Sequence, residues 1–221
     1  MAARRKSNDP AEKPRLGKGE RTRADVRAAV LALMNERPLA DILLDDILLR
    51  SGKTVGSFYF HYKSKEAVIE EVADELIGGI YAVDAIDQDA GGHDARQMLQ
   101  VFVERLCDGF ARQPLASRQA VWLINTSPRL NAAWQQYRTN YIDALLRRLV
   151  QPEADEAAET ANRLAVQFTI FGIERTLEVS MLANDEELRL IGRRPRILQK
   201  AVLEIAIATL TARGLLHRRQ E

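Results

Sequence analysis

The chain has 221 residues, of which 46% are hydrophobic and 29% charged, with a formal net charge of +1 at pH 7 and a single cysteine. This length allows one large domain, or a small domain fused to a larger one. No apolar run approaches the roughly 18 to 20 residues that span a bilayer. The basic N-terminus is not followed by an apolar stretch, which excludes a secretory signal and predicts a cytoplasmic protein. Cys107 alone cannot form an internal disulfide or a paired-cysteine metal site.

Charge is unevenly distributed along the chain. Residues 1 to 63 hold thirteen Lys and Arg against eight Asp and Glu, a net charge of +5, and the remainder carries −4. A basic front on an acidic body suits a module that meets phosphates, although a solvated basic tail explains the same charge equally well. Charge alone therefore leaves nucleic-acid binding open.

Apolar residues recur at helical spacing through nearly all of the chain after residue 19, and no stretch shows the alternation of a strand. We therefore expect an all-α fold of about nine helices. Residues 1–19 are polar, contain two prolines and two glycines, and carry too little apolar surface to offset the entropy of ordering them. They are expected to form a flexible basic arm.

Three short helices are expected directly after the arm. Thr22 is a suitable N-cap for the first, which must end before Pro38, and the second covers about residues 45–50. Gly52 then allows the left-handed backbone of a tight turn, and Thr54 can cap the third helix. The helices that follow are expected at about 64–80, 99–110, 117–125, 128–149, 154–182 and 195–212.

Residues 51–68, SGKTVGSFYFHYKSKEAV, have the pattern of a helix-turn-helix unit around its second helix. That helix enters the DNA major groove, so it must be short, anchored from behind and rich in groups that reach bases and phosphates. Val55, Phe58 and Tyr62, spaced three and four residues apart, are expected to face the core. The side chains left to meet DNA are those of Thr54, Gly56, Ser57, Tyr59 and His61.

These positions suit different contacts with DNA. Gly56 removes a side chain where the backbone would approach the duplex. Tyr59 and His61 are long enough to reach phosphate oxygens, and Lys65 can clamp another phosphate. Base reading is expected mainly of Thr54, Val55 and Ser57. Thr22 and Lys53 complete the candidate DNA-binding set.

The stretch from Thr22 to Leu76 resembles the DNA-binding domain of TetR/AcrR-type transcriptional regulators. The family pattern runs hydroxyl, any residue, Gly, small hydroxyl, hydrophobic, Tyr, then His and an aromatic, and it closes on Ser-Lys-Glu. It is matched by Thr54, Gly56, Ser57, Phe58, Tyr59, His61, Tyr62, Ser64, Lys65 and Glu66, with Asp46, Ile47 and Gly52 before it. One departure is Leu43, where the family usually has a Thr or Ser that caps the second helix, so Asp41 or the backbone must serve.

The resemblance implies a regulator that binds a palindromic operator in double-stranded DNA as a homodimer, with its last two helices forming a two-fold four-helix interface. The apolar candidates for that interface are Ile170, Ile173, Leu177, Met181, Val202, Ile205 and Ala206. The domains would be the arm over 1–19, a helix-turn-helix unit over 20–65, and a ligand-binding and dimerisation body over 66–221.

Aromatic and polar residues of the body could line a cavity for a small-molecule effector, although any one aromatic is more often plain core. The candidates are Phe102, Phe110, Trp122, Asn125, Trp134, Tyr137, Tyr141, Gln167, Phe168, Phe171, Glu174 and Arg175. We expect a homodimeric repressor that a small, largely apolar effector releases from DNA, with no enzymatic activity, cofactor or metal. The alternatives are an architectural DNA-binding protein without a ligand, and a helical ligand carrier or enzyme that retains the front domain.

Overall fold

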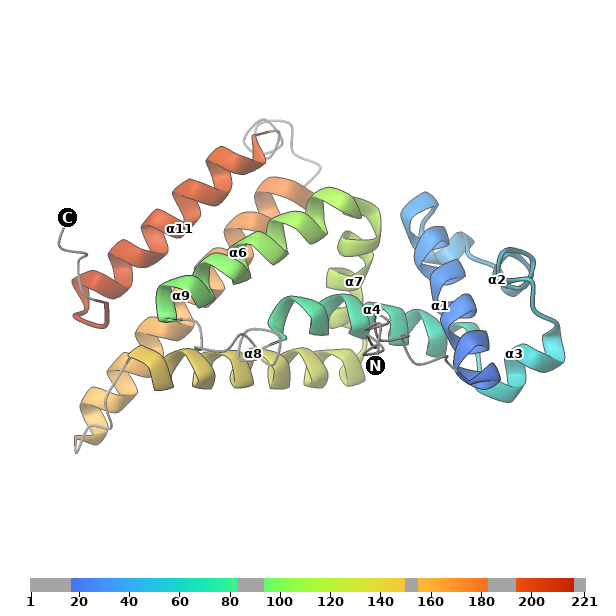
Figure 1. The fold of residues 1–221 in the computed structure, drawn as a ribbon, viewed down its shortest axis with the longest axis horizontal. Helices are drawn as coiled ribbons and strands as arrows, with labels where there is room; N and C mark the ends of the chain where they lie inside the picture. Colours follow the sequence, from blue (N-terminus) through green and yellow to red (C-terminus); the bar gives the residue numbers. More distant parts are fainter. Residues whose placement is uncertain (1–16, 83–93, 150–154, 183–193, 217–221) are drawn as a thin grey trace, which may run out of the picture.

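The computed structural model describes residues 17–82, 94–149, 155–182 and 194–216. Within these ranges the chain forms nine α-helices and one short 3-10 helix, with no strand (Figure 1). The expected all-α fold is confirmed. Most of the expected basic arm, and most of the segments between the helices expected at 64–80 and 99–110 and at 154–182 and 195–212, lie outside the described residues.

The front of the elongated molecule consists of α1 (Lys18–Glu36), the 3-10 helix (Leu39–Asp41), α2 (Leu44–Ser51) and α3 (Val55–His61) (Figure 1). α1 begins before the expected N-cap Thr22, because the backbone N–H of Gly17 donates to the Glu20 carboxylate at 3.0 Å and closes the first turn. The Thr22 hydroxyl instead donates to the carbonyl oxygen of Lys18 at 3.1 Å, inside the helix.

The turn between α2 and α3 follows the expected geometry. Gly52 has φ 64° in the left-handed region, where a side chain would be strained. The Thr54 hydroxyl accepts a hydrogen bond from the N–H of Ser57 at 3.3 Å and so caps α3. At the start of α2, the Asp46 carboxylate accepts from the N–H of Leu43 at 3.1 Å. No side chain, that of Asp41 included, accepts from an N–H of the first turn of α2, so only the backbone part of the expectation remains.

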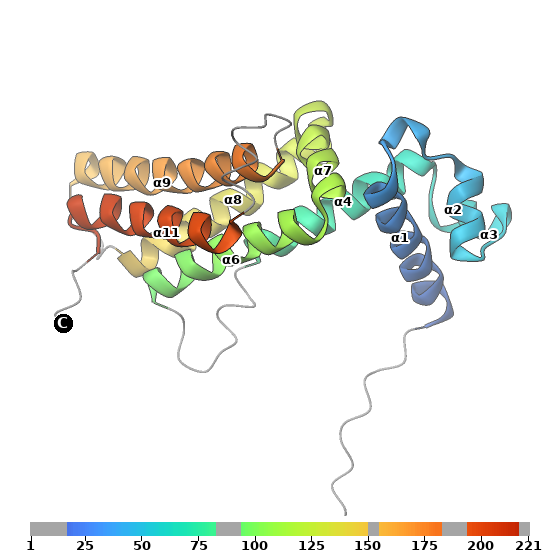
Figure 2. The same cartoon turned by 90° about the horizontal axis from the view of Figure 1, so that it is seen from above.

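Helix α4 (Lys65–Tyr81) runs from the front helices into the body (Figures 1 and 2). The Ser64 hydroxyl accepts from the N–H of Ala67 at 3.2 Å and caps it as expected. Val68, Ile69 and Val72 are buried in the first half of this helix. One continuous helix therefore belongs to the front packing at one end and to the body at the other.

The body is a bundle of five further helices (Figure 2). They are α6 (Ala95–Arg112), α7 (Pro114–Thr126), α8 (Pro128–Leu149), α9 (Glu156–Leu182) and α11 (Pro195–Ala212). Pro114 occupies the first turn of α7, where its missing N–H is not needed, so this helix begins before the expected residue 117. None of the described helices combines the length and the apolar character needed to cross a membrane.

Aromatic packing holds the centre of the body together. The rings of Phe102 and Tyr141 stack with centroids 4.7 Å apart, and the Tyr81 ring lies 5.3 Å from Phe102. The buried Tyr141 hydroxyl donates to the carbonyl oxygen of Met98 at 2.7 Å, which satisfies its polar end. Phe102 and Tyr141 are therefore core residues.

Candidate DNA-binding face and effector cavity

The outer side of α3 presents an unusual amount of exposed apolar surface. Val55, Tyr59 and Phe60 are 52%, 54% and 84% exposed, whereas Phe58 and Tyr62 are buried. Phe58 and Tyr62 face the core as expected. Val55 does not, because it is the first residue of α3 and the two aromatic rings fill the inner side without it.

The absence of a side chain at Gly56 fits the approach of another molecule. A Cβ atom built there would meet nothing within 4 Å, so no packing inside the chain requires glycine at this position. Thr54 and Gly56 are exposed on α3 or at its cap, and Ser57 and His61 are half-buried. The predicted base-reading and phosphate-reaching residues therefore gather on this one short helix.

Three other members of the candidate DNA-binding set have partners inside the chain. Thr22 is buried and its hydroxyl is bonded to Lys18, and its contact with DNA stays a prediction. The Lys53 ammonium lies 2.6 Å from the Asp25 carboxylate, and the Lys65 ammonium donates to the carbonyl oxygen of Ile42 at 2.6 Å. The charges of Lys53 and Lys65 thus stabilise the front helices, and their contact with phosphate stays a prediction.

The sequence analysis missed Phe60 and several cations near α3. Phe60 lies two residues from both Phe58 and Tyr62, a spacing that places it on the opposite side of the helix. A Cβ at Gly19 would lie 3.4 Å from the His61 ring, so the start of α1 adjoins the end of α3. Near α3, the exposed cations Lys18, Arg21 and Lys63 have no ion pair with the described residues.

Ion pairs and a buried amide fix the front helices to the rest of the chain. The Glu71 carboxylate of α4 accepts from Arg23 at 2.8 Å and from Arg27 at 3.0 Å, both on α1. Burial alone would raise the pKa of Glu71, but these two guanidinium groups outweigh it and lower the pKa. From α7, the buried Gln119 amide donates to the carbonyl oxygens of Met34 at 2.7 Å and Arg37 at 3.2 Å, at the end of α1.

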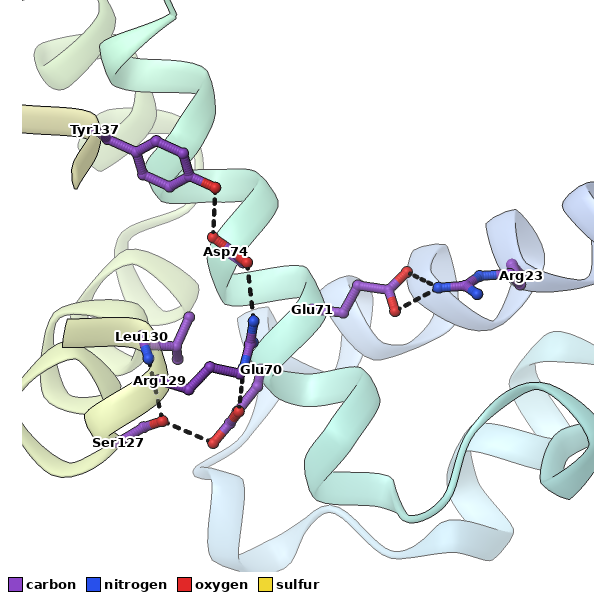
Figure 3. A network of polar contacts seen from close by, with 8 residues as sticks. All are labelled: Arg23, Glu70, Glu71, Asp74, Ser127, Arg129, Leu130 and Tyr137. Atoms are coloured by element: carbon purple, nitrogen blue, oxygen red, sulfur yellow. Dashed lines mark hydrogen bonds and ion pairs between the residues drawn. The ribbon is translucent and has the colours of Figure 1, made fainter. Parts of the chain in front are cut away.

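A second polar network joins the opposite side of α4 to the start of α8 (Figure 3). Arg129 donates to Glu70 at 2.7 Å and to Asp74 at 3.0 Å, and the hydrogen bond from Arg129 lowers the pKa of Glu70. Ser127 also donates to Glu70 at 2.8 Å, and Tyr137 donates to Asp74 at 2.8 Å. The first half of α4 is therefore held from both sides.

The second half of α4 forms a wall of the main cavity of the described residues, which has a volume of about 230 Å³. Helices α6, α7, α8 and α9 supply the other walls. The lining residues are Leu76, Ile77, Ile80, Tyr81, Leu106, Gly109, Phe110, Ser117, Ala120, Val121, Ile124, Asn125, Trp134, Glu174, Arg175 and Glu178. The wall is mostly apolar, with two carboxylates and one guanidinium, as is typical of a small-molecule site.

The structure places only part of the candidate pocket set on this wall. The lining members are Phe110, Asn125, Trp134, Glu174 and Arg175. The expectation is corrected for the others: Phe102 and Tyr141 stack in the core, Tyr137 bonds Asp74, and Trp122 and Phe168 are exposed. Phe171 covers the Arg138 guanidinium with its ring, and Gln167 is not on the wall. Tyr81, which the sequence analysis missed, lines the cavity.

A buried carboxylate, Glu174, lies at the inner side of the cavity. Its Oε1 accepts from the Tyr81 hydroxyl at 2.5 Å, and that hydroxyl accepts from the Trp134 indole N–H at 3.1 Å. The Arg138 guanidinium lies 3.9 Å from Glu174 Oε2 and 4.0 Å from the ring centroids of Trp134 and Phe171. Burial raises the pKa of Glu174 to about 7.

Glu174→Gln is expected to change how stability depends on pH. Because the folded state keeps the Glu174 proton to a higher pH than the unfolded chain, the native protein loses stability as the pH rises from about 4.5 to about 7. The glutamine cannot titrate. The difference in free energy of unfolding, variant minus wild type, should therefore increase by up to about 3 kcal/mol between acidic and mildly alkaline pH. Urea unfolding at both pH values measures it, with Glu159→Gln as the control. Parallel pH profiles would contradict the buried, titrating carboxylate.

Most of the candidate dimer residues lie on the buried sides of α9 and α11. Ile170, Ile173, Leu177, Val202 and Ala206 are buried within the chain itself, and Met181 is half-buried. Ile173, Val202 and Ala206 still line a groove between α9 and α11, so a role for these residues in a dimer stays a prediction. Ile205 alone is strongly exposed, at 67%. The outer stripe of these helices is formed instead by Leu164, Phe168, Phe171, Ile197 and Ile205.

No family model matches the chain. It is similar to the HTH-type transcriptional regulator EthR of Mycobacterium tuberculosis (strain CDC 1551 / Oshkosh), with 25% identity over 210 residues, which cover 89% of this chain and 92% of the relative. EthR of Mycolicibacterium smegmatis is 27% identical over 129 residues, 54% of this chain and 57% of that one.

Solved structures share the fold. A TetR transcriptional regulator from Streptococcus agalactiae 2603V is similar with a TM-score of 0.52 and 17% identity, over 86% of this chain and 95% of that one. A Streptomyces coelicolor A3(2) protein gives a TM-score of 0.54 at the same identity, over 84% and 98%. The arrangement of helix-turn-helix front and helical body is thus common to all three chains.

Proposed function

We propose that the chain is a helix-turn-helix transcriptional regulator of the TetR family, to whose members it is similar in sequence and fold. In this proposal it is a cytoplasmic, homodimeric repressor released from its operator by a small, largely apolar effector. The observation that carries the proposal is the course of α4. Its first half is bonded to the DNA-binding front, and its second half lines the cavity. A ligand that moves this helix changes both regions together.

The front helices would bind DNA through the outer side of α3. Tyr59 and Thr54 can donate hydrogen bonds to phosphate or base acceptors, and the exposed Phe60 ring adds apolar contact. The open space at Gly56 leaves room for the duplex. Lys18, Arg21 and Lys63 would attract the phosphate backbone, so binding should weaken as salt concentration rises.

The effector would act as a wedge between α4 and the helices around the cavity. Leu76, Ile80 and Tyr81 present the second half of α4 to the ligand. The bonds from Arg129 to Glu70 and Asp74 transmit a shift of α8 to the first half of that helix. In a dimer, such a shift changes the separation of the two α3 helices, which must match half-sites on one face of the duplex.

The dimer itself would form through the outer stripe of α9 and α11. Phe168 and Ile205 are 74% and 67% exposed and line a shallow groove between these two helices. Exposed apolar residues concentrated on two adjacent helices indicate a protein interface. A second copy is the occupant that fits, because a single helix-turn-helix reads too few base pairs for specificity and two-fold pairing supplies the second reading helix.

Tyr59→Ala tests the DNA-binding part of the proposal. Loss of a hydrogen bond to a charged phosphate costs about 1.5–3 kcal/mol, so affinity for a duplex selected from a random pool should fall about tenfold or more. Fluorescence anisotropy with the labelled duplex measures the change. Trp122→Ala removes an equally exposed aromatic ring from α7 and should leave DNA affinity unchanged. Equal affinity of Tyr59→Ala and the wild type would remove α3 as the contact surface.

The cavity favours this function over that of an architectural DNA-binding protein without a ligand. Its wall is mostly apolar and includes the second half of α4, whose first half is bonded to the front helices. Ligand screening by thermal shift, followed by competition with bound DNA, tests the effector part. A ligand that stabilises the protein and releases the duplex is the expected result. Stabilising ligands that all leave the duplex bound would contradict release.

A further inference from the structure

The cavity wall offers hydrogen-bond acceptors more readily than donors. The Tyr81 hydroxyl already donates to Glu174, and the Trp134 indole N–H already donates to Tyr81. Ser117 and Asn125 donate to main-chain carbonyl oxygens at 3.2 Å and 2.8 Å. A ligand with only acceptors would find these four donors engaged. The buried Arg138 Nη1, which has no hydrogen-bond partner among the described residues, does not line the cavity, and the Arg175 guanidinium on the wall is exposed.

Glu174 is the acceptor that remains available. Its Oε1 is used by Tyr81, but Oε2 makes no hydrogen bond to any described residue. The nearest cation, Arg138, stays 3.9 Å away because its guanidinium is held between two aromatic rings. The Glu174 side chain is only 14% exposed, so its carboxylate is largely removed from water, and Oε2 has only the distant Arg138 guanidinium opposite it. A buried carboxylate oxygen in that state favours a charged donor.

The rest of the wall also suits a cation on an apolar body. The aromatic rings of Tyr81, Phe110 and Trp134 face the cavity, and such rings attract cations. The volume of about 230 Å³ exceeds the roughly 150 Å³ of an engineered apolar cavity that binds benzene. A benzene ring with a short alkyl chain therefore matches the available space.

We propose that the effector is an organic amine: a protonated amino group that donates to the Glu174 carboxylate, attached to an apolar body that fills the cavity. This inference rests on the proposed function, since it names the chemistry of the ligand that the cavity would hold. At the mouth, the exposed Arg175 is paired with Glu178 at 2.8 Å and does not offset the carboxylate inside.

Three compounds of equal shape test the inference by calorimetry with the full chain: phenylbutylamine, phenylbutanol and phenylbutanoate. The amine should bind at least about tenfold more tightly than the alcohol, because both can donate to the Glu174 carboxylate but only the protonated amine adds the attraction of opposite charges. The anion should not bind detectably. Equal binding of amine and alcohol, or preference for the anion, would overturn the proposal.

Glu174→Gln keeps an oxygen for Tyr81 and removes the charge. The variant should lose the preference for the amine, by about tenfold or more, while alcohol binding stays the same. Glu159→Gln makes the same change at an exposed site in the first turn of α9, away from the cavity wall, and should bind the amine like the wild type. An unchanged amine affinity in Glu174→Gln would overturn the role of this carboxylate.

A DNA-release assay run alongside separates this inference from the proposed function. If the amine binds through Glu174 but leaves the duplex bound, the ligand chemistry stands and release by this ligand fails. If other compounds release the duplex and none of the three binds, regulation stands and the amine assignment is wrong. The expected result is amine binding that releases the duplex in the wild type and fails to do so in Glu174→Gln.

Discussion

Replacing Phe168 or Ile205 with glutamate is expected to convert the protein to a monomer and to weaken operator binding by about 10²–10⁴-fold. Both side chains lie on the outer stripe of α9 and α11, where a second copy would bury them. A carboxylate buried there without a partner costs far more than an apolar contact contributes. Two linked reading helices bind with an avidity that one helix cannot reach, so the loss on DNA exceeds that of any single contact.

The oligomeric state and the operator affinity measure this prediction together. Sedimentation at micromolar concentration gives the mass, and anisotropy gives the affinity. Trp122→Glu places the same charge on an exposed aromatic position of α7 and should remain a dimer with normal affinity. Because both substituted residues are exposed in the single chain, the fold should survive. Dimers formed by Phe168→Glu and Ile205→Glu would place the interface elsewhere.

Phe58→Ala is expected to destabilise the front helices by about 3–5 kcal/mol and to abolish specific DNA binding. Phe58 is fully buried, and its ring contacts those of Tyr59 and Tyr62 at centroid distances of 5.4 Å and 5.6 Å. Truncation leaves a cavity directly behind α3, the helix proposed to bind DNA. Urea unfolding, followed by circular dichroism, measures the loss of stability.

Phe60→Ala is the matched control, since it removes the same ring two residues away. Phe60 is 84% exposed, so its loss should change stability by less than about 0.5 kcal/mol. If Phe60 contacts DNA, the variant should still bind more weakly than the wild type. Equal losses of stability in the two variants would contradict the inner and outer sides assigned to α3.

Local signals predicted much of the fold. Ser64 and Thr54 cap the helices expected after them, and Pro128 and Pro195 open α8 and α11 where a first-turn proline belongs. The prediction that Thr22 caps the first helix is wrong for a physical reason. A threonine hydroxyl can bond the carbonyl four residues earlier inside a helix as well as cap one, and the residue pattern does not distinguish the two.

The outer and inner sides of α9 and α11 could not be separated from the sequence. Both helices are apolar around much of their circumference, so Ile170 and Phe168 look equally suited to a core or to a partner. The packing of α9 and α11 on α6 decides the matter by burying one stripe and exposing the other. That packing depends on contacts between segments far apart in the chain.

The cavity was predicted only in part for the same reason. Glu174 and Arg175 interrupt an apolar helix face, which made them candidates for the cavity. Both residues line its wall. Tyr81 and Glu174 are 93 residues apart, and no local pattern links a tyrosine at the end of one helix to a carboxylate on another. Aromatic type alone did not distinguish wall from core, as Phe110 and Phe102 illustrate.

The buried Gln119 amide limits how freely the front helices could be exchanged between related proteins. From α7 in the body, it donates hydrogen bonds to two carbonyl oxygens at the end of α1. Helix α4 contributes the buried side chains of Val68, Ile69 and Val72 to the core. A graft that transplants residues up to 65 would leave both behind. A chimera that joins the front helices of one protein to the body of another therefore needs its junction after α4. The end of its α1 must also place two carbonyl oxygens where the Gln119 amide can donate to them.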